Sequence, residues 1–400
     1  MNILNKIGNN LWKSNSSIYS SLIKKTSVIT LSVGIFSILI SSSVLDGFQY
    51  SIKEKIFDFS GHLNISNFGN GLSFKNYPID TNSGIGSNYQ EVNEIEDAIP
   101  FVLLSALIEK NNKSEGVIFK GVDIKYLDKI SPHLYYKNNI EKLSNSIIIS
   151  SSHSEKLNLN VNDTVSIFFP NDPPVFRKLK IKSIYDTGLE EFDNSFVFGD
   201  IDLGRKIYGW DENYASGINL YLSNDEHTIS TYEKIKNLSS YDEFIETSES
   251  KYSQVFDWLK LLDKNVVIFF IILSFVACFN MISVVLIFIM DKVKTIGILK
   301  SFGTKDSIIY SIFYRAGVHI LIKSLLISNF FAFVFIYVQS KFKIISLDKD
   351  SYYLDFVPIK FEILKIILIN MSLSMIILIS IYLPIYFIGK ISVNDNVKFN

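Results

Sequence analysis

The chain has 400 residues, with 39 Lys and Arg against 40 Asp and Glu, a formal net charge of −1, and 48% hydrophobic residues. Because positive and negative residues are nearly equal in number, the chain lacks the strong charge bias that is typical of proteins that bind nucleic acids or other polyions. We therefore expect no nucleic-acid partner. The single cysteine, Cys278, excludes a disulfide within the chain.

Four apolar segments follow one another along the chain. The longest unbroken one runs from Val266 to Met290, and about 20 apolar residues suffice for a helix to cross the hydrocarbon core of a bilayer. The third contains Lys323 near its start and the fourth contains Asn370 and Pro384, which neighbouring helices and snorkelling tolerate. We predict four transmembrane α-helices, at residues 27–45, 266–290, 318–338 and 366–388.

Basic residues at the ends of these segments predict their orientation. Lys24 and Lys25 immediately precede the first segment, and five Lys and Arg residues lie between the second and the third. Basic residues in short loops favour the cytoplasm. We therefore expect 1–26 to be a cytoplasmic or interfacial segment, 291–317 and 389–400 to be cytoplasmic, 46–263 to form a large extracytoplasmic domain, and 339–360 to be a short external loop.

The first apolar segment has two interpretations. A basic start, a short apolar run and Ser41-Ser42-Ser43 also fit a cleavable signal peptide. Against this, apolar residues continue beyond the segment at spacings of three or four, at Leu45, Phe48, Ile52, Ile56 and Phe59. This pattern favours one helix that extends outward as an amphipathic stalk, and it fits a helix packed at the base of the domain equally well.

The extracytoplasmic segment combines strand and helix patterns. Alternating or apolar runs bounded by turn residues predict strands at 62–66, 100–109, 116–121, 146–150 and 164–169. Helical spacing predicts helices at 89–99, 152–157, 201–208 and 225–237, and a further helix at 242–263 that leads into the second membrane segment. The expected fold is thus a membrane protein with four transmembrane helices and a large α+β domain between helices 1 and 2.

The sequence offers no catalytic constellation. It contains no phosphate-binding Gly-x-x-x-x-Gly-Lys-Ser/Thr loop, no Gly-x-Ser-x-Gly and no His-Glu-x-x-His, and its five histidines lack the spacing of metal ligands. We expect neither an enzyme, nor a metal site, nor a cofactor bound by this chain. Any use of ATP with magnesium would belong to a partner.

The most informative cytoplasmic stretch is Lys292 to Thr304. Its spacing predicts a short helix with Ile296, Leu299 and Lys300 on one side, which ends at Gly303, where a left-handed residue is permitted. Such a helix could simply cap the bundle of membrane helices. Its apolar side chains and flanking lysines also suit docking into a groove on an acidic partner.

The run KVKTIGILKSFGTKDSIIYSIF resembles the coupling-helix motif of FtsX-like ABC transporter permeases, and Phe313 to Gly317 continues the pattern. Four further stretches resemble the lipoprotein-releasing permeases of the LolC/LolE type, in the same order and over essentially the whole chain. They are VLDGFQYSIKEKIFDFSGHLNI, DTGLEEFD, DSYYLDFVPI and LPIYFIGKIS.

This resemblance implies a permease subunit in the bacterial inner membrane, with both termini cytoplasmic. It would work with a separate ABC ATPase and with a second copy or a sister permease, and would release acylated lipoproteins by mechanotransmission. The residues implied to couple to the ATPase are Lys294, Thr295, Ile296, Gly297, Ile298, Leu299, Lys300, Phe302 and Gly303. Those implied to line the lipoprotein cavity are Ile38, Val44, Leu45, Phe48 and Ile52.

One loop and two rival functions complete the expectations. Relatives that recruit a LolA-like periplasmic chaperone carry an extended hairpin where this chain has only 169–177, so a candidate contact there consists of Pro170, Pro173, Pro174 and Phe176. One rival is an FtsX-type regulator of cell-wall hydrolases, whose exported domains are usually smaller than 46–263. The other is a MacB-like efflux component, in which the ATPase is generally fused to the permease.

Overall fold

The computed structural model describes residues 18–71, 76–110, 113–136, 142–348 and 352–386. The described residues form two compact units. The first contains 18–50, 259–346 and 356–386, and the second contains 51–258 and 347–355 apart from the gaps just given. The predictions for the N-terminal segment before residue 18 and for the tail after residue 386 lie outside the described residues.

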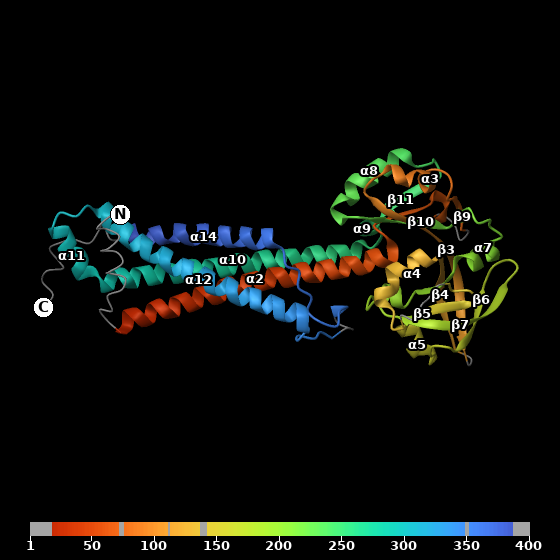
Figure 1. Cartoon of the computed structure of the whole chain (residues 1–400), viewed down its shortest axis with the longest axis horizontal. Coiled ribbons are helices and arrows are strands. Elements are labelled where there is room, and N and C mark those ends of the chain that lie inside the picture. Colours follow the sequence, from red (N-terminus) through yellow and green to blue (C-terminus); the bar gives the residue numbers. More distant parts are fainter. Residues whose placement is uncertain (1–17, 72–75, 111–112, 137–141, 349–351, 387–400) are drawn as a thin grey trace. The chain divides into compact units, whose positions relative to one another are not determined.

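The first unit is built from long apolar helices. Among the residues that the structure describes, four helices are long and apolar enough to cross a membrane, which confirms the predicted number. They are α2 (Ile18–Ser60), α10 (Ser253–Asp291), α12 (Asp306–Phe342) and α14 (Ile363–Tyr386) (Figure 1). Because α2 and α10 have 43 and 39 residues, each is about twice as long as a bilayer requires. Their ends at Ser51–Ser60 and Ser253–Trp258 belong to the second unit.

Apolar side chains and a few polar pairs hold these helices together. Met281, Ile309 and Ile381 are fully buried in the main cluster of the bundle. Asn329 of α12 and Asn370 of α14 exchange two side-chain hydrogen bonds of 3.0 Å, so each amide finds a partner inside the apolar bundle. The polar residues of the third and fourth segments are thus accommodated by neighbouring helices, as expected.

The second unit contains a closed ring of six strands. They are β3 (Ile95–Lys110), β4 (Lys113–Val122), β8 (Phe196–Asp200), β5 (Ser146–Ser150), β7 (Val175–Tyr185) and β6 (Thr164–Phe169), and β6 pairs back with β3. The β4–β8 and β5–β7 pairs are parallel and the other ladders are antiparallel. Apolar side chains such as Phe119, Ile149 and Ile167 fill the interior, as in small barrels.

A second layer extends from the long strand β3. Its first half pairs with β10 (Gly217–Leu222), and the order then continues through β1 (Leu63–Asn67) to β11 (Glu243–Thr247). This part has its own apolar core, to which Ile85 of α3 (Ile85–Asn88) and Ile235 of α8 (Thr228–Leu238) contribute. The remaining short elements are η1 (Phe68–Gly71), β2 (Ile79–Asp80), η2 (Tyr89–Glu91), α4 (Ile124–Ile130), η3 (Ser131–His133), α5 (Ser151–Leu157), α6 (Glu190–Asp193), β9 (Tyr214–Ala215), η4 (Asp225–His227) and α9 (Ser248–Lys251).

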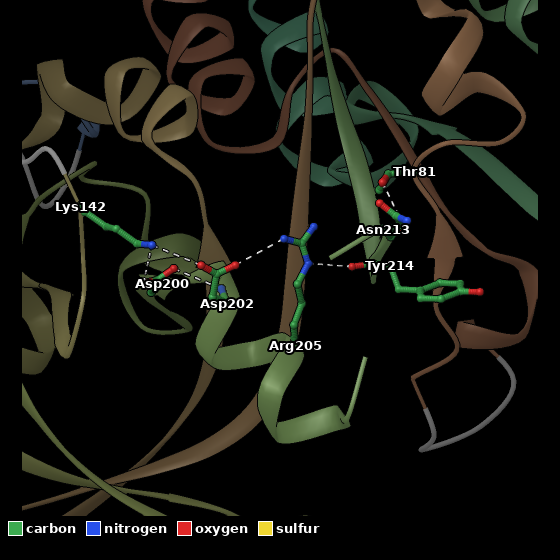
Figure 2. A network of polar contacts seen from close by, with 7 residues as sticks. All are labelled: Thr81, Lys142, Asp200, Asp202, Arg205, Asn213 and Tyr214. Carbon is green, nitrogen blue, oxygen red and sulfur yellow. Dashed lines mark hydrogen bonds and ion pairs between the residues drawn. The ribbon is translucent and has the colours of Figure 1, made fainter. Parts of the chain in front are cut away.

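Helix α7 (Ile201–Tyr208) shows how a predicted helix is fixed on the barrel. Asp200 caps its first turn by accepting from the amide of Asp202 at 3.1 Å. Figure 2 shows that Asp202 also pairs with Lys142 and with Arg205, at 3.3 and 3.5 Å, while Arg205 Nε donates to the carbonyl oxygen of Tyr214 at 2.9 Å. The same view includes Thr81, whose hydroxyl donates to the Asn213 carbonyl at 2.9 Å.

One predicted helix, at 89–99, is wrong, and another, at 242–263, begins later than predicted. Residues 89–99 form only the short turn η2 before β3 begins at Ile95, and residues 243–247 form strand β11 rather than the start of a helix. In both cases strand pairing overrides the local pattern, because Ile99 pairs with Asn219 of β10 and Ile245 pairs with Ile65 of β1. The helix that leads into the second membrane segment starts only at Ser253.

Candidate functional site

Helix α11 (Val293–Ser301) is the short helix predicted between the second and third membrane segments. Gly303 follows it with a φ of +76°, in the left-handed region. The amide of Gly303 donates to the Lys300 carbonyl at 2.9 Å, and that of Thr304 donates to the Leu299 carbonyl at 3.1 Å. This pair of bonds is the Schellman arrangement, and it confirms the predicted end of the helix at Gly303.

One face of α11 covers the helix bundle. Ile296 is 1% exposed and belongs to the main apolar cluster, Gly297 is buried, and Leu299 packs half-buried against the same cluster. Lys300 Nζ pairs with Asp306 Oδ1 at 3.2 Å. The side expected to dock, with Ile296, Leu299 and Lys300, is therefore turned inward. The capping interpretation holds for this side because an interfacial helix buries its better apolar stripe first.

The opposite face of α11 is open. Ile298 and Phe302 are 57% and 82% exposed, although both are large apolar side chains, and Lys294 is exposed as well. The spacing of four residues places Lys294, Ile298 and Phe302 in one row along the helix and its C-terminal turn. We call this row the α11 outer face. These three residues are among those predicted to couple to the ATPase, but the helical pattern in the sequence drew attention to the opposite side, with Ile296, Leu299 and Lys300.

The predicted cavity residues on α2 divide into two groups. Ile38 and Leu45 are 4% and 9% exposed and Ile52 is fully buried, so these three, seven residues apart, are covered by the chain itself. Val44 and Phe48 are half-buried. In the single chain only Val44 and Phe48 of the five are therefore partly exposed, because the seven-residue row formed by the other three is the buried seam of the helix. That the five residues line a lipoprotein cavity stays a prediction.

The open face of α2 includes residues that the sequence reasoning missed. Ile29 and Val33 are 61% and 57% exposed, and helical spacing places them in line with Ile40, Val44 and Phe48. The signal that could have identified these residues is the exposure of apolar side chains along one face of a membrane helix. This face can be recognised only when the buried face of the same helix is known.

The candidate chaperone-contact loop is a tight hairpin. Strands β6 and β7 pair up to Phe169 and Val175, so residues 170–174 alone make the connection, and the Asp172–Pro173 peptide is cis. Pro170, Pro173 and Pro174 are exposed, and Phe176 is 66% exposed beside the ring of Phe168, with 4.7 Å between ring centroids. The loop is short, and it exposes three prolines beside Asp172.

The outer end of α2 is fixed inside the second unit. A helix leaves its last four carbonyls without partners in the helix. Two of them are satisfied locally: Phe57 O accepts from the amide of Gly61 at 2.7 Å, and Ser60 O accepts from Asn64 Nδ2 at 2.6 Å. Gly61 has a φ of +71°, so the chain reverses through a left-handed residue into β1.

The other two carbonyls are satisfied from distant strands and helices. Asp58 O accepts from the Tyr221 hydroxyl at 3.1 Å, while Phe59 O accepts from Lys120 Nζ at 2.8 Å and from the Tyr126 hydroxyl at 2.6 Å. All four terminal carbonyls of α2 thus have partners within one folded unit. We call this set of contacts the α2 anchor.

A second contact ties α2 to two loops of the same unit. Lys55 Nζ donates to the carbonyls of Thr187 and Tyr353, at 2.5 and 2.6 Å. Tyr353 belongs to the segment between α12 and α14, and its ring meets Trp258 edge-on at 5.9 Å. Thr187 of DTGLEEFD and Tyr353 of DSYYLDFVPI therefore both contact the α2 extension, which no pattern in the sequence indicated.

Burial sets the charge state of several groups in the second unit. It lowers the pKa of His62 and of His153 to about 4, against an ordinary value of 6.5, and it raises the pKa of Asp193 to about 6. Asp193 nevertheless accepts hydrogen bonds from the amides of Thr187 and Gly188, at 3.1 and 2.9 Å. These bonds order the loop that Lys55 contacts.

The buried histidines predict a pH dependence of stability. Between pH 4 and 6.5 the unfolded chain binds a proton on His153 that the folded chain does not, so the free energy of unfolding rises with pH across this window. Asp193 acts in the opposite direction between its two pKa values. The variant His153→Gln should flatten the rise by up to about 3 kcal/mol, measured by denaturation of the full chain in detergent.

The exposed histidine His227 provides the control for this measurement. The variant His227→Gln should keep the slope of the unmodified chain. A His153→Gln variant with an unchanged slope between pH 4.5 and 6.5 would show that His153 titrates alike in the folded and unfolded states.

The described residues contain no cluster of three or more His, Cys, Asp or Glu side chains suited to a metal ion. The buried polar groups above are engaged with one another and with backbone carbonyls. The described residues instead provide an apolar helix bundle in which α11 has an exposed apolar face, and a long helix, α2, whose last carbonyls are hydrogen-bonded within the β-rich unit.

Comparison with known proteins places these features in a context. Residues 267–393 match the family model "FtsX-like permease C-terminal", a range that contains most of α10 and all of α11, α12 and α14. The described part of that range is the helix bundle without α2.

Several relatives match over nearly the whole chain. In Buchnera aphidicola subsp. Schizaphis graminum, an uncharacterized membrane protein is 25% identical, covering 94% of both chains, and the lipoprotein-releasing system transmembrane protein LolC is 23% identical, covering 95% of this chain and 94% of that one. LolE of Haemophilus influenzae is 21% identical, covering 90% and 91%. The crystal structure of the periplasmic region of MacB from Actinobacillus actinomycetemcomitans is 15% identical and covers 51% of this chain and 97% of that one, at a TM-score of 0.35 that assigns neither fold nor function.

Proposed function

We propose, since this chain is an ABC-transporter permease of the FtsX-like type, that it releases acylated lipoproteins from the bacterial inner membrane for transfer to the outer membrane. The observation that carries the proposal is the similarity to lipoprotein-releasing permeases over at least 90% of both chains, joined to a helix that is fastened in the β-rich unit.

The work to be done explains the need for a partner. Each methylene of an acyl chain contributes roughly 0.8 kcal/mol to membrane anchoring, so removal of a multiply acylated protein requires an energy source. The chain has no phosphate-binding loop of its own. In our proposal a separate ATPase holds ATP and magnesium and docks on the α11 outer face, where Ile298 and Phe302 are exposed beside Lys294.

The proposed topology places the two units on the path of the force. The lysines around α11 favour a cytoplasmic position for this helix. In our proposal both termini then lie in the cytoplasm and the β-rich unit lies outside. Motion of α11 would then reach the outer unit through α2. The α2 anchor supports this step, because each of the last four carbonyls of α2 is hydrogen-bonded within that unit. The open face of α2, which includes Val33 and Val44, would contact the acyl chains together with a second copy or a sister permease.

The β6–β7 hairpin is the proposed place for a periplasmic acceptor. Its exposed prolines and Phe176 offer apolar contacts at a short tip, which also exposes Asp172 and requires little ordering on binding. A LolA-like carrier would take the released protein there.

Depletion of this permease tests the proposal in cells. Triacylated lipoproteins destined for the outer membrane should accumulate in the inner membrane within a few generations, measured by membrane fractionation and palmitate labelling. Normal sorting would refute the proposal; if peptidoglycan hydrolysis or drug efflux failed instead, the hydrolase-regulator or efflux function would replace it.

A further inference from the structure

Lys120 is an unusual residue for the interior of a β-rich unit. Lys120 lies near the end of β4 and is only 6% exposed. Among the described residues, no carboxylate pairs with its amine. Burial, and then the charge of Lys251, lowers the pKa of Lys120 well below its ordinary value. A buried amine without a counter-ion costs stability unless its hydrogen bonds are satisfied.

The three donors of the Lys120 amine have three partners. Nζ donates to Phe59 O at 2.8 Å and to the Tyr126 hydroxyl oxygen at 3.0 Å. With the Asn219 amide oriented to suit its neighbours, its oxygen accepts the third bond at 3.1 Å. The amine also lies 4.9 Å from the ring centre of Phe101 and 4.3 Å from that of Tyr126. These contacts bring several elements of the unit together at one point.

That point is the last turn of α2. The C-terminal end of a helix carries partial negative charge on its free carbonyls, which favours a cation close by. The Phe59 ring beside the carbonyl is 2% exposed and contacts the rings of Tyr185, Phe192 and Phe198, with centroids 5.6 to 5.7 Å apart. Lys120 thus joins β4, β10 and α4 to the end of the membrane helix through one polar centre.

We infer that Lys120 is a positioning residue for force transfer: it locks the end of α2 to the β-rich unit, so that movement of the helix displaces the unit instead of slipping within it. The inference rests on the proposed function, because it assigns the coupling step of that function to one side chain. It goes beyond the general coupling described above by predicting that a loss at this site separates ATP hydrolysis from release.

The test uses the full permease in its complex with the ATPase, reconstituted in proteoliposomes that contain a triacylated lipoprotein. In Lys120→Met the unbranched side chain is one atom shorter and loses its donors, so Phe59 O retains only the Tyr126 hydroxyl. ATP hydrolysis should stay within about twofold, and lipoprotein released per ATP should fall roughly tenfold, as expected when one buried hydrogen bond is lost at the junction.

Two further variants separate positioning from general stability. Lys125→Met makes the same exchange at an exposed lysine five residues away and should leave both quantities unchanged. Tyr126→Phe removes the other side-chain donor to Phe59 O and should lower release per ATP in the same direction by a smaller factor. If Lys120→Met does not fold, Tyr126→Phe still decides the question.

The outcomes distinguish the inference from the proposed function. Release per ATP equal to that of the unmodified complex in Lys120→Met, or in Tyr126→Phe when Lys120→Met does not fold, overturns the inference. A parallel fall of hydrolysis and release, with their ratio preserved, also overturns it, because a purely structural role lowers only the amount of active protein. Failure of the unmodified complex to release lipoprotein overturns the proposed function itself.

Discussion

Replacing Phe302 by aspartate is expected to separate this chain from the ATPase that we propose as its partner. Phe302 is 82% exposed at the end of α11, and the aspartate would bring a charge into the apolar contact that we assign to the partner. Loss of a central aromatic residue from an interface commonly costs about 2–4 kcal/mol, so affinity should fall roughly 30- to 700-fold. Co-purification of the ATPase and ATP hydrolysis by the complex measure the loss.

The controls use other positions around α11. Ile298→Asp, on the same row, should have a similar effect, whereas Ser307→Asp, at an exposed position early in α12, should retain the partner. Gly297→Asp is unsuitable because Gly297 is buried and the variant would disturb the bundle. A Phe302→Asp complex that still co-purifies and hydrolyses ATP normally would remove the α11 outer face from the docking proposal.

Gly47 of α2 is expected to tolerate no side chain at all. A Cβ atom there would lie 2.6 Å from the carbonyl oxygen of Pro358 and 2.7 Å from the Cα atom of Ile359, so backbone would have to move. Close by, the amide of Lys360 donates to Ser43 O at 3.1 Å, and Lys365 pairs with Asp46. Gly47→Ala should therefore destabilise the chain by about 1–3 kcal/mol, as overpacking does.

Gly34 provides the matched control on the same helix. A Cβ atom at Gly34 meets nothing within 4 Å, so Gly34→Ala should be neutral or stabilising by about 0.5–1 kcal/mol through helix propensity. Melting temperatures of the two full-length variants in detergent make the comparison. Equal temperatures for Gly47→Ala and the unmodified chain would mean that α2 and the 358–359 segment are not in contact.

The sequence predicted the elements that depend on local pattern. Hydropathy alone located the four long helices, because each apolar run is long enough for a helix that spans a membrane. Helix α7 and the C-cap at Gly303 followed from spacing and from a glycine at the right place. These features require only neighbouring residues.

The features that could not be predicted depend on distant partners. Strand β11 and the start of β3 have helix-like patterns, and only pairing with β1 and β10 decides their form. Lys120 stands in an apolar run that reads as an ordinary strand, and its role appears only when the end of α2 reaches it. The open face of α11 likewise depends on which of two apolar stripes the bundle covers.

Release of a triacylated lipoprotein from proteoliposomes is the most direct measurement of what this permease does. The purified permease, its ATPase and, where one exists, the sister permease are reconstituted with labelled lipoprotein, and ATP is added with an acceptor for the acyl chains. We predict ATP-dependent transfer of the triacylated lipoprotein to the acceptor. We predict no ATP-dependent transfer of the same protein without acyl chains. Retention of the lipoprotein while ATP is hydrolysed at the full rate would contradict the proposed function.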